Sequence, residues 1–212
     1  PLCAECSPVL LDSSACHERY GRFCIAACRP LEVLTLRGET LTDAAGRVVA
    51  EGTEAIWSAL SSAFRTVRLG GGSPEVAYLP GWIGYVGYEV GRLVERLPGQ
   101  APRRSALPDL RLAFYDAILL YDTKEKTWRL VDLEYPREDE GESAAEALLR
   151  IAGSASSRAP GEFTTADGAK RPDAAPNFAP QAYREAVRRC IDYIAAGDIF
   201  QVNLSQRFTV PC

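Results

Sequence analysis

Positive charge and histidine are scarce in this sequence, and methionine is absent. Its 24 Lys and Arg residues are outnumbered by 28 Asp and Glu, giving a net charge of −4 and a pI near 5.2. A nucleic-acid groove or an anionic membrane surface requires clustered basic side chains, so the composition argues against both partners. The only histidine, His17, lies in a polar stretch and is interpreted as a surface residue, which leaves no Ser–His–Asp set.

Long apolar runs are also missing. No segment approaches the roughly 18 apolar residues of a membrane-spanning helix, and residues 1–10 lack the basic and apolar regions of a signal peptide. Seven cysteines are an odd number in a chain too large to need disulfides, so a reduced, cytoplasmic setting is the simplest interpretation. Because the chain has no methionine and stops where a strand is predicted to begin, we expect it to be an internal fragment of a longer protein.

Four cysteines have a spacing similar to that of a zinc ribbon, namely Cys3 with Cys6 and Cys24 with Cys28. The second pair lies in "RFCIAAC", which is typical of a strand. Four residues of strand would separate its two side chains by about 13 Å, too far to share one metal ion. We therefore interpret these cysteines as small core residues.

Apolar patterning predicts an antiparallel N-terminal domain. The segment "RFCIAACRPLEVLTLRG" predicts one or two strands broken at Arg29-Pro30, and a hairpin is predicted around Ala45-Gly46. Thr53 precedes a helical pattern over residues 54–67. Together these elements indicate a sheet with at least one helix packed on it.

Glycine recurs at positions 81, 84, 87 and 91 within "GWIGYVGYEVG". The spacing matches neither a phosphate-binding loop nor a dinucleotide-binding fingerprint. Glycine weakens a strand unless another backbone must come close. We interpret the segment as a strand pressed against a helix or a second sheet, with a ligand touching the backbone as the alternative.

The remaining segments predict a hairpin, a linker and the start of another domain. Two apolar runs, residues 110–122 and 127–136, flank the turn "TKEK" and form the clearest hairpin. A helix is predicted over residues 143–151. Residues 153–179 are rich in Gly, Ser, Ala and Pro and are interpreted as a linker.

A helix is predicted to begin at Pro180, with Gly197 as the C′ residue that follows its end, and a strand is predicted over residues 200–208. One face of that strand would be apolar. The other face would carry Gln201, Asn203, Ser205 and Arg207. Amide, hydroxyl and guanidinium groups in a row fix carboxylates and hydroxyls by directed hydrogen bonds, so they indicate either a polar cleft wall or an ordinary solvent face.

Three separated segments resemble one enzyme family. "YREAVRRCIDYIAAGD" and "GDIFQVNLSQRF" resemble the start of the catalytic domain of chorismate-utilising enzymes, the family of anthranilate synthase component I and aminodeoxychorismate synthase component I. "GWIGYVGYEVGRLVERLP" resembles the signature of their N-terminal domain. "LLDSS" and "YGRFCIAACRP" resemble the segments that shape its tryptophan pocket. These segments occur in the family's order along nearly the whole chain.

Within the family, "QVNLSQRF" and "GWIGYVGYE" are more similar to the aminodeoxychorismate branch, because anthranilate synthases more often have Val in place of Asn203. This resemblance implies an enzyme component that converts chorismate and ammonia to 4-amino-4-deoxychorismate for p-aminobenzoate and folate synthesis. Anthranilate synthase component I of tryptophan biosynthesis is the alternative. A non-catalytic tryptophan-binding module is a third hypothesis.

The resemblance also implies partners and a cofactor. Ammonia would come from glutamine through a separate glutamine amidotransferase subunit, and Mg²⁺ would bind the chorismate carboxylate as a template and charge neutraliser. In family order the reactive lysine, the general acid and the Mg²⁺ ligands all follow residue 212. No catalytic residue or metal ligand is therefore assigned in this chain, and the fragment alone is expected to be inactive.

The tryptophan pocket is the one site that the resemblance places inside this chain. Ser13 matches the pocket serine, and Tyr20, Gly21, Arg22 and Phe23 match the stretch that closes over the indole ring. A hydroxyl suits the head group of L-tryptophan and an aromatic side chain suits its ring. The ligand would be structural or inhibitory. The alternative is that Ser13 caps a turn and Phe23 is a core residue.

The expected fold class is α+β. Residues 1–152 would form an antiparallel-sheet domain of the anthranilate synthase component I type, and residues 153–179 the linker. Residues 180–212 would begin the chorismate-binding catalytic domain.

Overall fold

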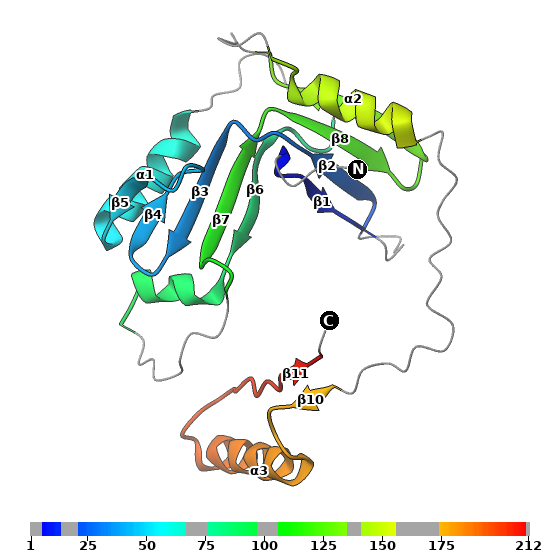
Figure 1. The fold of residues 1–212 in the computed structure, drawn as a ribbon. Coiled ribbons are helices and arrows are strands. Elements are labelled where there is room, and N and C mark those ends of the chain that lie inside the picture. The colour runs from blue at the N-terminus through cyan, green and yellow to red at the C-terminus, as the bar shows by residue number, and fades with distance from the viewer. Residues whose placement is uncertain are drawn as a thin grey trace. The chain divides into compact units, whose positions relative to one another are not determined.

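The structure is a computed structural model that describes residues 6–13, 21–66, 76–96, 106–134, 141–155 and 174–210 (Figure 1). The chain divides into two compact units, residues 1–159 and 160–212. Both contain helices and antiparallel strands, so the predicted α+β class is confirmed. The two predicted hairpin turns, around Ala45-Gly46 and at "TKEK", are also confirmed.

The first unit contains two antiparallel sheets. One has five strands in the order β5-β4-β3-β7-β6, and the other has four in the order β1-β2-β8-β9. The five-stranded sheet consists of β3 (Glu32–Arg37), β4 (Thr40–Thr42), β5 (Val48–Glu51), β6 (Gly81–Val86) and β7 (Leu110–Tyr115). The four-stranded sheet consists of β1 (Val9–Leu11), β2 (Phe23–Ala27), β8 (Ala117–Asp122) and β9 (Thr127–Asp132).

The two sheets pack face to face, and a helix covers the outer face of each (Figure 1). Residues of both sheets, including Ile25, Ala113 and Ile118, form the cluster between them. Helix α1 (Thr53–Thr66) and the 3₁₀ helix η2 (Tyr88–Leu93) pack on the five-stranded sheet, and α2 (Ala144–Ala155) packs on the four-stranded sheet. Alternation along each strand therefore gives every sheet two buried faces.

The apolar run over residues 110–122 is two strands that belong to different sheets. The bend falls at Asp116, which is 1% exposed and lies between β7 and β8. The predicted break at Arg29-Pro30 has the same effect, since β2 and β3 also lie in different sheets. The prediction of one continuous strand over residues 110–122 was wrong. The sequence shows no sign of the bend, because neither Gly nor Pro lies at it.

Helix α2 differs from its predicted bounds in a small way. The helix predicted over 143–151 continues to Ala155, so it enters the stretch interpreted as a linker. Gly153 lies inside it, since one glycine weakens a helix without ending it. Helix α2 begins with a capping box, in which the Glu146 N–H donates to Ser143 Oγ at 3.0 Å and the Ser143 N–H donates to Glu146 Oε2 at 2.8 Å.

The second unit contains helix α3 (Pro180–Ala196) and a short pairing of β10 (Ala175–Pro176) with β11 (Phe208–Thr209). The helix ends as predicted at Gly197, whose φ of 80° is left-handed. The strand predicted over residues 200–208 is wrong except at its end, because most of that segment has no ladder partner among the described residues. Its predicted polar and apolar faces are therefore not formed in this structure.

Two of the four glycines, Gly84 in β6 and Gly87 just after it, are explained by close packing against the neighbouring backbone. A Cβ at Gly84 would lie 1.9 Å from the Arg111 carbonyl oxygen, and one at Gly87 would lie 2.7 Å from the Asp109 carbonyl oxygen. The prediction of a strand is confirmed, but the close neighbour is β7 in the same sheet rather than a helix or a second sheet.

Replacing Gly84 with Ala should lower the free energy of unfolding by about 1–3 kcal/mol, because β6 must move away from β7. Gly81→Ala is the matched control, since a Cβ at Gly81 meets nothing within 4 Å. Urea unfolding followed by circular dichroism gives both values. Equal stability of the two variants would contradict the close-packing explanation.

Candidate functional site

Ser13 joins the end of β1 to β2. Its hydroxyl donates to the Phe23 carbonyl oxygen at 2.7 Å, and its N–H donates to Cys24 Sγ at 3.3 Å. The side chain is half-buried. These bonds fix the backbone at the start of β2, which is where the resemblance places the tryptophan pocket. Tyr20, another residue of that prediction, lies outside the described residues.

Arg22 forms a two-pronged ion pair with Asp122. Its Nε donates to Asp122 Oδ1 at 3.0 Å, and its terminal nitrogen donates to Asp122 Oδ2 at 2.6 Å. The same guanidinium lies 5.0 Å from the ring centroid of Phe23, a cation–π distance. The ring of Phe23 also lies edge to face with the ring of Tyr78, with the two centroids 5.6 Å apart.

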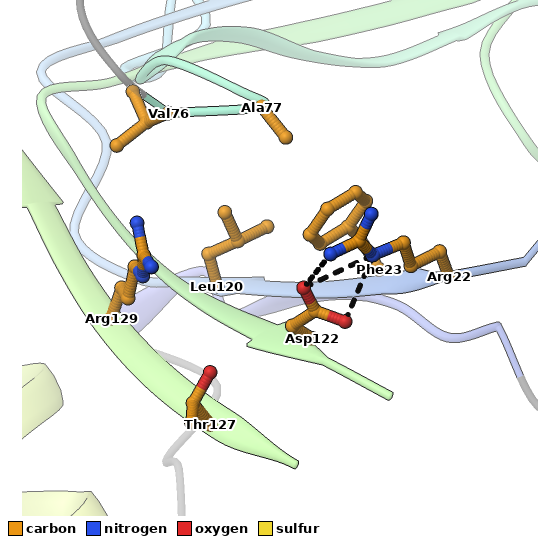
Figure 2. Close-up of a pocket in the computed structure, with 8 residues that line it drawn as sticks. All are labelled: Arg22, Phe23, Val76, Ala77, Leu120, Asp122, Thr127 and Arg129. Atoms are coloured by element: carbon orange, nitrogen blue, oxygen red, sulfur yellow. Dashed lines mark hydrogen bonds and ion pairs between the residues drawn. The ribbon is translucent and has the colours of Figure 1, made fainter. Parts of the chain in front are cut away.

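A pocket of about 250 Å³ opens beside this pair (Figure 2). The apolar part of its wall consists of Phe23, Val76, Ala77 and Leu120. Charged and polar groups come from Arg22, Asp122, Thr127 and Arg129. Figure 2 shows Val76 and Ala77 facing the strands across the pocket, with Leu120 between Arg129 and Phe23. The pocket thus combines an apolar middle with charges at both sides.

The strand register explains why these side chains meet. Phe23 pairs with Asp122, which pairs with Thr127, and Leu120 pairs with Arg129. Directly paired residues share a face of a sheet, and residues two apart on one strand do as well. All five side chains therefore lie on the face that packs toward the other sheet. Leu120 still belongs to the buried cluster between the sheets, whereas Thr127 and Arg129 are exposed.

Of the predicted pocket residues, Arg22 and Phe23 line this cavity. Ser13 does not line it but holds the Phe23 backbone. Gly21 precedes both and has a left-handed φ of 78°, which glycine adopts without strain. The lining residues of β8 and β9 were missed. The sequence could have indicated them, because Thr127 and Arg129 lie two residues apart on the second strand of the predicted hairpin. Asp122 lies directly across the turn from Thr127, so all three polar side chains share one face.

The cysteines of the zinc-like spacing lie in two different surroundings. Cys28 is fully buried under α2, with Cys6 packed against the same cluster, and burial raises the pKa of the Cys28 thiol. The Cys24 thiol instead donates to Asp12 Oδ1 at 3.3 Å. Cys3 lies outside the described residues. Among the residues that the structure describes, no three His, Cys, Asp or Glu side chains gather as a metal site would require.

The polar residues near the end of the chain are exposed. Gln201, Asn203, Ser205 and Arg207 all face solvent in the second unit. The Arg207 N–H donates to Asn177 Oδ1 at 2.8 Å, and the Gln206 amide donates to the Phe178 carbonyl oxygen at 3.3 Å. A separate finding is that no described helix is long and apolar enough to cross a membrane.

Removing the Arg22 guanidinium should raise the pKa of Asp122. Chiefly because of its hydrogen bonds with Arg22, this pKa is lowered from 3.8 to about 2. A carboxyl whose pKa is lowered by folding stabilises the fold above its unfolded pKa, and that stabilisation is lost as the pH falls through the folded pKa. Between about pH 4 and pH 2, the free energy of unfolding should therefore fall less in Arg22→Gln than in wild type. In the variant, the pKa of Asp122 lies closer to its value in the unfolded chain.

Carboxyl NMR titration of Asp122 measures the effect directly. Arg47→Gln is the matched control, because Arg47 pairs with Asp43 in a separate turn. An Asp122 pKa that is the same in wild type and Arg22→Gln would show that the ion pair does not form in solution.

Comparison with known proteins places this chain in a family. Residues 8–212 match the family described as chorismate binding enzyme. Aminodeoxychorismate synthase component 1 from Klebsiella aerogenes is 28% identical over 211 residues, which cover 99% of this chain and 44% of that protein. Anthranilate synthase component 1 from Thermus thermophilus is 39% identical over 137 residues, which cover 63% of this chain and 28% of that protein.

A solved structure has the same fold. The crystal structure of anthranilate synthase component I from Streptococcus pneumoniae TIGR4 matches with a TM-score of 0.68 and 25% identity, over 89% of this chain and 42% of that chain. The predicted fold type and resemblance are thereby confirmed. The chain spans less than half the length of each of these relatives. From the match over residues 8–212, the chain belongs to the chorismate-binding enzyme family.

Proposed function

We propose that the protein containing this chain acts as component I of an aminodeoxychorismate synthase. It would convert chorismate and ammonia to 4-amino-4-deoxychorismate, the precursor of p-aminobenzoate in folate synthesis. The observation that carries this choice is Asn203 within "QVNLSQRF", where anthranilate synthases more often have Val. Support also comes from the similarity to the Klebsiella aerogenes protein, which extends over 99% of this chain.

The alternative activity is that of anthranilate synthase component I. Its support is the similarity to the Thermus thermophilus protein, which is higher in identity but covers only 63% of this chain. Both activities begin from the same substrate and differ in where ammonia enters the ring. A single product assay therefore distinguishes the two candidates.

The proposal includes partners and a metal ion that the family resemblance implies. A glutamine amidotransferase subunit would supply ammonia, and the setting would be the cytoplasm. Mg²⁺ would neutralise the chorismate carboxylate. No step of the reaction is assigned to a residue of this chain. Among the described residues, no three His, Cys, Asp or Glu side chains gather as a metal site would require.

With chorismate, Mg²⁺ and ammonium salts, the longer protein that contains this chain should form 4-amino-4-deoxychorismate. Liquid chromatography with mass spectrometry identifies that product, and fluorescence detects anthranilate. Accumulation of fluorescent anthranilate would reject the aminodeoxychorismate assignment in favour of the alternative.

We also propose that the region around β2 binds L-tryptophan, which would stabilise or inhibit the enzyme. Support comes from Phe23 and Arg22, which lie together at the wall of an open pocket. Ser13 would act through the backbone, since its hydroxyl holds the Phe23 carbonyl oxygen. In this proposal Phe23 contacts the indole ring, as an edge-to-face or stacked aromatic neighbour.

Ser13→Ala should weaken tryptophan binding by about tenfold, the expected cost of losing one hydrogen bond that positions Phe23. Ser61→Ala, on the exposed side of α1, is the matched control. Isothermal titration of L-tryptophan into the chain gives both affinities. Tryptophan binding that is as tight in Ser13→Ala as in wild type would remove Ser13 from the site.

A further inference from the structure

Two cysteines that the proposed function does not use lie under helix α2. Cys28 is fully buried in the cluster that α2 covers, and Cys6 packs against the same cluster. Both are thiols in this structure. Cys6 comes before β1 and Cys28 directly follows β2, so the fold brings together two separate segments of the chain.

The pairing of β1 with β2 places these two segments side by side. Val9, at the start of β1, pairs with Ala27, at the end of β2. Beyond this pair, the Arg29 N–H donates to the Cys6 carbonyl oxygen at 2.7 Å. Paired strands lie about 5 Å apart, and a disulfide joins residues whose Cα atoms are about 4.4–6.8 Å apart. The backbone spacing at this place therefore suits a disulfide.

Both thiols also lie close to one arginine of α2. The pKa of the Arg150 guanidinium is raised, chiefly by its hydrogen bond with Glu142 and to a smaller extent by Cys6 and Cys28. The pKa of the Cys28 thiol is raised first by burial and then by Cys6. Each thiol is therefore within reach of the charge of the other, and both side chains point toward α2.

The residue that follows each cysteine has an unusual backbone conformation. Ser7 has a φ of 40° and Arg29 a φ of 54°. This left-handed region is unfavourable for a residue with a Cβ, so it persists only where other contacts fix it. The Tyr115 hydroxyl donates to the Ser7 carbonyl oxygen at 2.8 Å, and Arg29 forms an ion pair with Glu142 at 2.9 Å. These contacts hold the two cysteines in place before any bond forms between them.

We propose that Cys6 and Cys28 are a modification site, at which a small disulfide such as oxidised glutathione converts the two thiols to an intramolecular disulfide. The bond joins the segment before β1 to the end of β2. This inference goes beyond the proposed function, because the bond requires neither chorismate nor a partner subunit.

The reaction is thiol–disulfide exchange in two steps. The Cys6 thiolate, which is the more exposed of the two, attacks one sulfur of the small disulfide, whose S–S bond breaks and releases one thiol. The Cys28 thiolate then attacks the Cys6 sulfur and releases the second thiol. The two cysteines lose two electrons to the small disulfide, and their two protons end on the released thiols. Because burial raises the pKa of Cys28, the second step is the slower one.

Incubation of the reduced chain of 212 residues with oxidised glutathione tests the site. The peptides that contain Cys6 and Cys28 should become joined, and their fragmentation in a mass spectrometer should place the bond between these two residues. Dithiothreitol should separate the peptides again. A bond from Cys6 to any other cysteine, glutathione that stays on Cys6 in wild type, or no bond at all would overturn the proposal.

Two variants separate the roles of the thiols. In Cys28→Ala, glutathione should stay on Cys6 as a stable adduct, because the thiol that displaces it is gone. In Cys6→Ala, Cys28 should remain unmodified, because it is fully buried. Cys24→Ala, on the same strand as the approach to Cys28, is the matched control and should form the Cys6–Cys28 bond at the wild-type rate.

Cys6 is only half-buried, so Cys6→Ala keeps the comparison available even if Cys28→Ala does not fold, and circular dichroism checks both variants. A folded Cys28→Ala without the glutathione adduct would remove Cys6 as the reacting thiol and overturn the proposal. Modification of Cys28 in Cys6→Ala would also overturn it, because the assigned order of attack would then be wrong.

The bond should also stabilise the fold. Closing the loop between the two cysteines should raise the Tm by about 5–10 °C, because it restricts the unfolded chain. Thermal unfolding followed by circular dichroism should show this rise in oxidised wild type and not in Cys6→Ala. A Tm that is unchanged or lower in the cross-linked protein would show that the two thiols are not neighbours in the native fold. The product assay and the tryptophan titration stand apart from this test, since it contains neither ligand.

Discussion

The bend at Asp116 is the constraint on which the first unit depends. Before it, Ala113 and Tyr115 of β7 face the space between the sheets, and after it Ile118 and Leu120 of β8 do. In a continuous strand these pairs would face opposite sides, because side chains alternate with a period of two. The bend shifts the alternation by one residue. Apolar side chains from both sheets thereby share one interior, each fully buried large one contributing about 1.5–3 kcal/mol.

The same bend positions the candidate site. Once β8 has entered the four-stranded sheet, Leu120 ends the buried cluster and Asp122 reaches the uncovered hairpin end. There the ion pair with Arg22 fastens β2 to β8 across the sheet, at side-chain exposures of 47% for Arg22 and 13% for Asp122. The pocket therefore begins where the buried cluster between the two sheets ends. This position explains why its middle is apolar and its rim is charged.

Local patterns in the sequence predicted most individual elements but not how they divide between sheets. Helix α3, with Pro180 at its start and Gly197 at its end, and the hairpin at "TKEK" have strong local signals. The bend at Asp116 has none, because its signal is the packing of distant strands. The strand predicted over residues 200–208 failed for a related reason, since alternation does not supply a ladder partner. Of the residues that line the pocket, motif resemblance had singled out Arg22 and Phe23, whereas Arg129 became visible only through cross-strand register.

Native-state hydrogen exchange of the amides in β7 and β8 tests the central claim most directly. If the bend at Asp116 joins both sheets into one interior, the hydrogen-bonded amides of Ala113 and Leu120 should exchange through the same opening, with the same free energy and the same dependence on denaturant. Exchange of Leu120 through a separate, lower-energy opening that leaves Ala113 protected would contradict the account. In that case the hairpin and its pocket would be an independent appendage to the five-stranded sheet.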